Sequence, residues 1–173
     1  LDVSVIDAMP GGRQKVVTKV LSNDQREKAH TMIGEELGAG HGVFIVYPLV
    51  EESEQTGVRD ATGMASHFQD SIFPDYRVGL LHGRMGAKDK EDVMRGFRDG
   101  EIDVLVCTTV IEVGIDVPRA TMIVVENAER FGLSQLHQLR GRVGRSTLKS
   151  RCLLLASTQR TNLATKRLRI MEK

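Results

Sequence analysis

The sequence contains no tryptophan, and aromatic residues make up only 4% of its 173 residues. It has two cysteines, Cys107 and Cys152, both inside apolar runs, so we expect buried free thiols in a reducing cytoplasm. No apolar run approaches the ~18–20 residues that span a bilayer, and no secretory signal precedes the first strand, so no membrane partner is expected. The first residue is Leu1 rather than Met, which indicates a fragment or a processed chain.

The charges are unevenly distributed along a chain whose formal net charge is only +1. Residues 1–129 carry 13 basic and 22 acidic side chains, a net of −9, whereas residues 130–173 carry 11 basic side chains and one acid, a net of +10. Such asymmetry favours a polyanionic partner, either nucleic acid or a nucleotide. A solvated basic helix near the C-terminus explains it equally well.

Hydrophobic residues make up 40% of the chain, which excludes disorder, and the length suits one domain. Short β-branched runs alternate with segments of helical periodicity. We expect strands at 3–6, 16–21, 43–47, 77–81, 103–107, 121–125 and 152–155, helices at 22–37, 64–73, 87–98, 133–139 and 161–171, and a mobile loop at 51–63. This order indicates an α/β fold with a mainly parallel sheet, in which function gathers at the carboxyl ends of strands.

A first candidate site is the segment 108–118, which directly follows an apolar strand. The hydroxyls of Thr108 and Thr109 could hold phosphate oxygens. Gly114 would let the backbone approach a ligand, and Asp116 could accept a hydrogen bond from a ribose hydroxyl. A capped turn without any ligand explains the same residues.

A second candidate is the run 138–145, in which four basic or amide side chains, those of Gln138, Arg140, Arg142 and Arg145, and two glycines fall within eight residues. A planar guanidinium can hold two phosphate oxygens at once, so two arginines beside glycine turns could clamp a triphosphate. No acid lies between residues 130 and 151 to neutralise them nearby, although a solvated basic helix end remains the alternative.

A third segment, His82-Gly83-Arg84, follows the strand predicted at 77–81 and could contact a phosphate backbone, although a structural histidine is the simpler interpretation. The sequence has no G-x-x-x-x-G-K-[S/T] phosphate loop, no acidic magnesium motif, no paired-cysteine zinc spacing and no G-x-S-x-G elbow. We therefore expect no metal ligands and only half of a nucleotide site, whose phosphates another domain must hold.

These segments resemble the second RecA-like motor domain of superfamily 2 helicases. The segments that carry the resemblance are 46–53 (similar to motif IV), His82-Gly83-Arg84-Met85, 108–118 (motif V) and 138–145 (motif VI). Pro48-Leu49 followed by Glu51-Glu52-Ser53, together with the run 127–137, resembles the RecG family of bacterial helicases. The resemblance covers essentially the whole chain and implies a RecA-like three-layer α/β/α domain with a mainly parallel central sheet.

The resemblance also implies roles for individual residues. Arg142 and Arg145 would be the catalytic arginines, with Arg145 as the preferred finger; the nucleotide would be faced by Gly114, Asp116 and Gln138, and DNA phosphates would be touched by His82, Gly83, Arg84, Thr108 and Thr109. ATP with Mg²⁺ would be held mainly by a first motor domain that is not in this sequence.

The family implies an ATP-dependent helicase of the bacterial cytoplasm, monomeric, which remodels branched DNA in recombination and repair. Its partners would be branched or duplex DNA and the N-terminal motor and wedge domains of the same full-length protein. The implied divisions are a linker and first strands at 1–22, the motor domain at 23–157, and a truncated helical hairpin at 158–173 that packs differently or frays. Two alternatives are the motor of a transcription-repair coupling factor and a non-catalytic α/β module that binds a nucleotide or protein.

Overall fold

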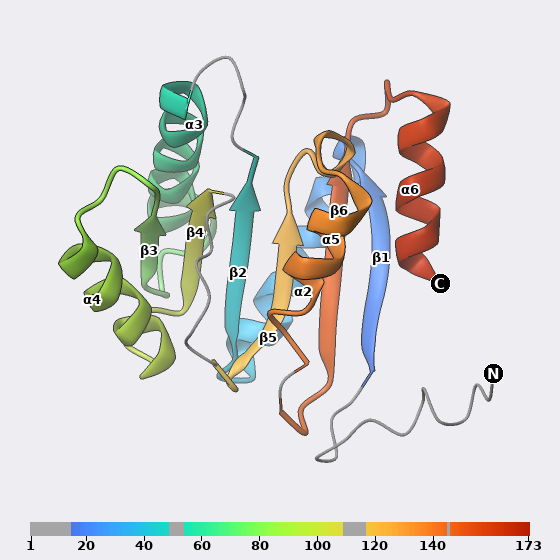
Figure 1. The fold of residues 1–173 in the computed structure, drawn as a ribbon. Coiled ribbons are helices and arrows are strands. Elements are labelled where there is room, and N and C mark those ends of the chain that lie inside the picture. Colours follow the sequence, from blue (N-terminus) through green and yellow to red (C-terminus); the bar gives the residue numbers. More distant parts are fainter. Residues whose placement is uncertain (1–14, 49–53, 109–116, 145) are drawn as a thin grey trace.

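The computed structural model of the chain describes residues 15–48, 54–108, 117–144 and 146–173. Six strands form one sheet, in which every strand pair is parallel and the order is β1-β6-β5-β2-β4-β3 (Figure 1). Their bounds are β1 Val16–Ser22, β2 Gly42–Tyr47, β3 Val78–Leu81, β4 Val104–Thr108, β5 Ala120–Val125 and β6 Ser150–Ala156. The strands expected between residues 16 and 155 are confirmed, whereas the strand expected at 3–6 lies outside the described residues.

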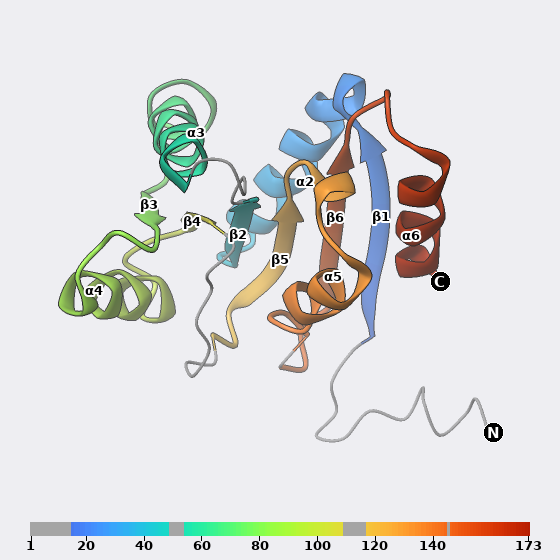
Figure 2. The ribbon, with the colours of Figure 1, turned by 45° about the horizontal axis from the view of Figure 1, so that its top comes forward.

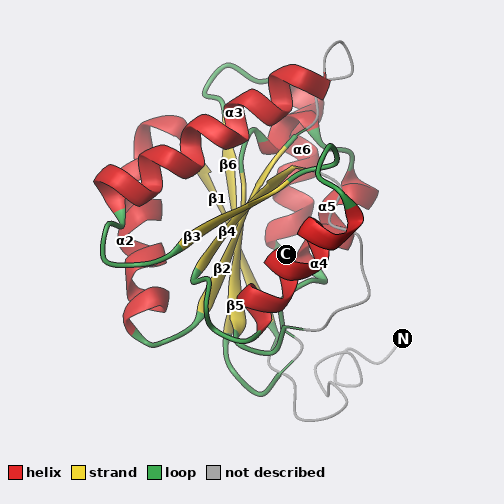
Figure 3. Ribbon diagram, turned by 90° about the vertical axis from the view of Figure 1, so that its left-hand side faces the viewer, coloured by secondary structure: helices red, strands yellow, loops and turns green. Residues whose placement is uncertain are grey.

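Helices cover both faces of the sheet, as Figure 3 shows edge-on. One face carries α2 (Arg26–Gly38) and α3 (Glu54–His67); the other carries α4 (Ala87–Arg98), α5 (Leu133–Arg140) and α6 (Asn162–Glu172). Three short helical turns flank these helices: η2 (Asn23–Gln25) before α2, η3 (Phe68–Ile72) after α3 and η4 (Ala128–Arg130) before α5. This arrangement confirms the expected RecA-like α/β/α fold.

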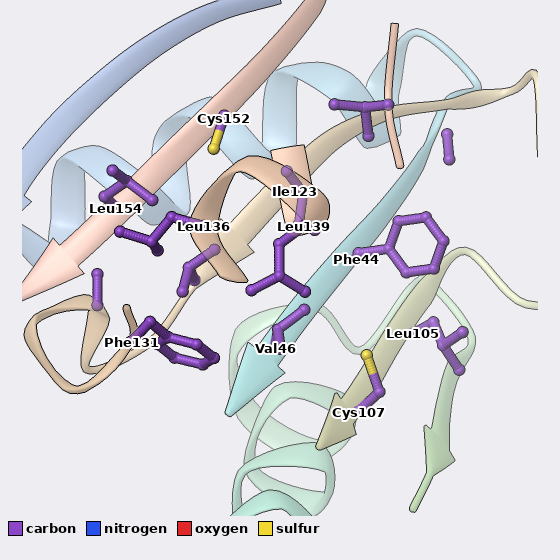
Figure 4. Packing of buried hydrophobic residues seen from close by; sticks show 14 of the residues in the cluster. Phe44, Val46, Leu105, Cys107, Ile123, Phe131, Leu136, Leu139, Cys152 and Leu154 are labelled. Carbon is purple, nitrogen blue, oxygen red and sulfur yellow. The ribbon is translucent and has the colours of Figure 1, made fainter. Parts of the chain in front are cut away.

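Alternation along each strand divides the core into two clusters, because successive side chains of a strand point to opposite faces. In β2, Phe44 and Val46 pack with α4 and α5, whereas Val43 and Ile45 pack with α2 and α3. Figure 4 shows the first cluster, where Leu136 and other α5 residues lie over the sheet. A strand buried on both faces must be apolar throughout, which explains the uninterrupted run in β2.

The prediction of a mobile loop at 51–63 is wrong, because α3 begins at Glu54. Ala61 is fully buried, and Phe68 follows it seven residues later on the same face, with Met64 and Ala65 partly buried between them. This is helical spacing. Glycine and threonine are weak helix formers and obscured the signal, so the stability of α3 comes from packing rather than from propensity.

The terminal helix α6 packs on the sheet. Ala164, Leu168 and Met171 are buried against the sheet, and α6 lies beside β1 and α5 (Figure 2). Its first turn is capped by the Thr161 hydroxyl, which accepts a hydrogen bond from the backbone N–H of Ala164 at 3.1 Å. A capped helix with one buried face is held by the same core as the rest of the domain.

Candidate nucleotide and DNA sites

The carboxyl ends of four neighbouring strands bring polar residues into one row. Glu126 follows β5, Tyr47 ends β2, Thr108 ends β4 and His82 follows β3, in the order of the strands across the sheet. Tyr47 and Thr108 are register partners. The sheet therefore gathers Thr108 and His82, both predicted to contact DNA, at the edge where the sequence led us to expect function.

Thr108 itself is fully buried at this edge. Its hydroxyl oxygen finds no hydrogen-bond partner among the described residues, which is uncommon for a buried polar atom. In this arrangement the side chain does not reach the surface. The next residue, Thr109, lies outside the described residues, as do Gly114 and Asp116.

The turn after β3 holds its histidine in one orientation. The backbone N–H of Arg84 donates to Nδ1 of His82 at 3.2 Å, so in the neutral imidazole the hydrogen is on Nε2. The Arg84 side chain is exposed and Gly83 is partly exposed. Gly86 then begins α4 without a side-chain cap, which leaves the first backbone N–H groups of this helix open to an anion.

The helix α5, which carries Gln138, runs back from the carboxyl edge, and the turn after it, which carries Arg142, leads into the amino end of β6 (Figure 1). Gln138 is exposed and Arg142 is partly buried. Val143 is buried, and Gly144 adopts a φ of +77°, a conformation that favours glycine. The turn therefore has a defined backbone on both sides of Arg142. Arg145 lies outside the described residues.

The predicted residues thus form two groups rather than one site. His82, Gly83, Arg84 and Thr108 share the carboxyl edge, whereas Gln138 and Arg142 lie towards the amino edge. The segment 109–116 belongs to the connection between the carboxyl end of β4 and the amino end of β5, and so joins the two edges in sequence.

Several arginines of the C-terminal segment have partners within the domain. Arg151 pairs with Glu36 at 2.8 Å, and three other arginines donate to main-chain carbonyl groups. These three are Arg140 to Met171 (2.9 Å), Arg160 to Ser157 (3.0 Å) and Arg167 to Glu129 (3.0 Å). Arg151 is paired with a carboxylate, whereas the bonds to carbonyl groups orient the other three side chains without neutralising their charge.

An ion pair between the half-buried Arg26 and the buried Glu126, at the carboxyl edge, was not anticipated. The guanidinium of Arg26 donates to both carboxylate oxygens of Glu126 at 2.7 Å each, and the Tyr47 hydroxyl lies 3.4 Å from one of them. The hydrogen bonds to Glu126 raise the pKa of Arg26, and burial raises the pKa of Tyr47. In the sequence, the signal for this pair was a single acid, Glu126, directly after an apolar strand, because a buried charge needs a partner.

Within the described residues, no group of three or more His, Cys, Asp or Glu side chains could hold a metal ion. None of the helices in this part of the chain is long and apolar enough to cross a membrane. Both cysteines are free and buried, and burial raises the pKa of Cys152 to about 12. These thiols are core residues rather than nucleophiles.

Comparison with known proteins identifies the class. Residues 24–147 match the family model "Helicase conserved C-terminal domain", and the chain belongs to that family. Within it, the chain is similar over nearly its whole length to helicases of the RecG type, which confirms the predicted resemblance. It is 46% identical over 172 residues to ATP-dependent DNA helicase RecG of Synechocystis, and 49% identical over 176 residues to that of Aquifex aeolicus. These matches cover 99% and 100% of the chain but only 21% and 22% of the relatives.

Solved helicase structures have a similar fold. A structure described as RecG bound to a three-way DNA junction superposes with a TM-score of 0.79 and 42% identity, covering 95% of this chain and 21% of that one. Domain 2 of the DEAD-box helicase Mss116p, bound to an RNA duplex, has a TM-score of 0.65 at 17% identity, covering 83% of this chain and 55% of that one. The second likeness concerns the fold alone. The chain spans about a fifth of the RecG proteins that it matches.

Proposed function

We propose that this chain is the second motor domain of an ATP-dependent DNA helicase that remodels branched DNA, such as stalled replication forks and Holliday junctions, in recombination and repair. The observation that carries the proposal is the 42% identity, over 95% of the chain, to a RecG structure described as bound to a three-way DNA junction. The RecG relatives favour this function over the motor of a transcription-repair coupling factor.

The nucleotide would be shared between two motor domains. Arg142 and Arg145 would reach the triphosphate of ATP, and the planar guanidinium groups would stabilise the charge that develops on the transferred phosphoryl group. Gln138, exposed on α5, would link the nucleotide to the DNA side, with Gly114 and Asp116 facing the nucleotide. A first motor domain of the same protein would hold ATP and Mg²⁺, because this sequence has no phosphate loop.

The DNA contacts would come from the carboxyl edge. His82 presents an Nε2–H donor, Arg84 an exposed guanidinium, and Gly83 lets the backbone approach a phosphate. Thr108 and Thr109 would join them. Closure of the two motor domains on ATP, and their opening after hydrolysis, would shift these contacts along duplex DNA.

The proposed organisation of the chain is a linker with the first strands at 1–22, the motor domain at 23–157, and the start of a helical hairpin at 158–173. The whole protein would be a monomer of the bacterial cytoplasm, with a wedge domain that recognises the branch point. The packing of α6 on the motor domain supports a hairpin that is docked rather than separate.

The decisive experiment measures ATP hydrolysis and junction unwinding by the full-length protein, with and without a synthetic three-way DNA junction. We expect hydrolysis that the junction stimulates and unwinding that requires ATP. A protein that binds nucleotide without hydrolysing it under any DNA condition would favour a non-catalytic module. Retention of RNA polymerase in a pull-down would instead favour the transcription-repair alternative.

A further inference from the structure

Stabilisation of the fold does not by itself explain the ion pair between Arg26 and Glu126. Arg26 is the first residue of α2, where the helix dipole disfavours a cation. Glu126 is almost fully buried, and removing a carboxylate from water costs about as much as its pairing returns. What the two bonds of 2.7 Å supply is geometry, because a guanidinium that grips both oxygens fixes the plane of the carboxylate.

The fixed carboxylate begins the turn that leads to α5. Glu126 is followed by Asn127 with a φ of +50°, the single non-glycine residue with positive φ among those described, and then by η4. The same turn is held from the other side. The Glu129 carboxylate accepts a hydrogen bond from the backbone N–H of Ser157 at 3.1 Å, and its carbonyl accepts one from Arg167 at 3.0 Å. The turn before α5 is therefore held by Arg26 of α2, Arg167 of α6 and the backbone N–H of Ser157.

The pair also lies in the row of residues at the carboxyl edge. Tyr47 donates its hydroxyl towards Glu126, while its own register partner on the next strand is Thr108. The backbone N–H of Glu126 donates to the carbonyl of Val46 at 2.8 Å, which extends the pairing of β5 with β2. One side of this cluster therefore adjoins residues proposed to contact DNA, and the other side begins the helix that carries Gln138 and leads to Arg142.

We propose that Arg26, Glu126 and Tyr47 are positioning residues that couple DNA contact at the carboxyl edge to the placement of α5 and hence of Arg142. The inference rests on the proposed function. If DNA binding shifts β2 or β4, Tyr47 would move with its strand and displace the Glu126 carboxylate. The displaced Glu126 would then change the conformation of the turn before α5. Among the described residues the Thr108 hydroxyl finds no hydrogen-bond partner, which is consistent with an edge that changes its contacts when DNA binds.

The experiment compares Glu126→Gln with a matched control, Glu36→Gln, in the full-length protein. Glu36 also accepts bonds from an arginine and a hydroxyl side chain, those of Arg151 and Thr121, but it lies at the other edge of the sheet. The measurements are the melting temperature, kcat and KM for ATP without DNA, and the stimulation of kcat by a three-way DNA junction. Tyr47→Phe and Arg26→Lys are measured in the same way.

We expect Glu126→Gln to lower the stimulation by DNA about five- to tenfold, at the lower end of the usual range of couplings between sites, with kcat without DNA and KM for ATP within about twofold of the wild type. Tyr47→Phe should lower stimulation in the same direction, and Arg26→Lys, which keeps the charge but not the two parallel bonds, should be intermediate. Glu36→Gln should lower the melting temperature and leave stimulation unchanged.

The inference is overturned if Glu126→Gln and Glu36→Gln have equal stimulation, or if the loss appears equally without DNA. Should Glu126→Gln fail to fold, Tyr47→Phe decides the question alone, since it removes only a hydroxyl. Measurements on the wild-type protein distinguish a failure of this inference from a failure of the proposed function. A wild-type protein without any DNA-stimulated hydrolysis contradicts the function, whereas a stimulated wild type with equally stimulated variants contradicts only the coupling.

Discussion

The backbone N–H of Gly144 donates to the side-chain oxygen of Ser150 at 3.0 Å, and this bond closes the turn between α5 and β6. Ser150 is buried, and its hydroxyl also lies 3.4 Å from the carbonyl oxygen of Leu148. One side chain at the start of β6 thus holds the backbone that follows Arg142 and Val143.

Ser150→Ala should destabilise the chain by about 1–3 kcal/mol, because the buried N–H of Gly144 loses its acceptor. Urea unfolding followed by circular dichroism measures this change. Ser146→Ala is the control in the same turn, since its hydroxyl accepts an exposed hydrogen bond from Leu148 and water can replace it. Equal effects of the two substitutions would show that the Gly144 bond contributes no more to stability than the exposed bond to Ser146.

Arg145→Ala in the full-length protein should lower kcat for ATP by about 10³-fold or more, the range found for arginine fingers, while the affinity for a non-hydrolysable ATP analogue changes little. Arg142→Ala should act in the same direction. Lys149→Ala, a nearby exposed cation, is the control and should leave kcat unchanged. Equal loss of binding and hydrolysis would indicate a structural role for the arginines.

The isolated 173-residue chain should hydrolyse no measurable ATP, with or without DNA. The physical reason is that its arginines can stabilise a transition state but nothing in the sequence resembles the phosphate loop that would hold the substrate. A malachite-green assay of released phosphate tests this directly. Robust hydrolysis by the purified chain, free of contaminating ATPase, would contradict the shared-site proposal.

His30 should make the chain less stable in mild acid. Its ring packs edge-on against Phe68 and Phe73, and burial, followed by the nearby charge of Arg26, lowers its pKa from the ordinary 6.5. The folded state therefore resists a proton that the unfolded chain accepts, so the free energy of unfolding falls as the pH drops below 6.5.

The test of this pH effect compares urea unfolding of the chain at about pH 7.5 and about pH 5.5, on either side of the ordinary imidazole pKa. His30→Phe should reduce the difference between the two conditions, because the group that takes up the proton is gone. The exposed His67→Gln should keep the wild-type difference. An undiminished difference in His30→Phe would assign the acid sensitivity to other groups.

Leu168→Ala should cost about 2–5 kcal/mol, the range for a truncated core leucine, because this side chain of α6 is 1% exposed within the core cluster. Leu163→Ala on the same helix should change stability by less than about 0.5 kcal/mol, since Leu163 is 65% exposed. Thermal unfolding of both variants measures the difference. Little effect of Leu168→Ala would mean that α6 is dispensable for the fold.

Local patterns predicted most elements of this fold. The helix at 87–98 was predicted with its observed bounds, because Val93, Met94 and Phe97 have helical spacing and Gly100 ends the segment with a φ of +87°. The apolar run of β2 likewise indicated a strand buried on both faces. The helix α3 was missed because its glycines and threonines carry little signal, and only packing under β2 and β4 makes the segment helical.

By itself the sequence determined the α/β class, the family and the residue types at each candidate site, since periodicity and short motifs are local properties of the chain. Only the tertiary structure decided which residues meet. Arg26 and Glu126 are 100 residues apart, and they pair because the strand order sets β5 beside β2 under the start of α2. The burial of Thr108 and the internal use of Arg140 and Arg151 also depend on that order. Strand order arises from the sum of long-range contacts, which no local pattern encodes.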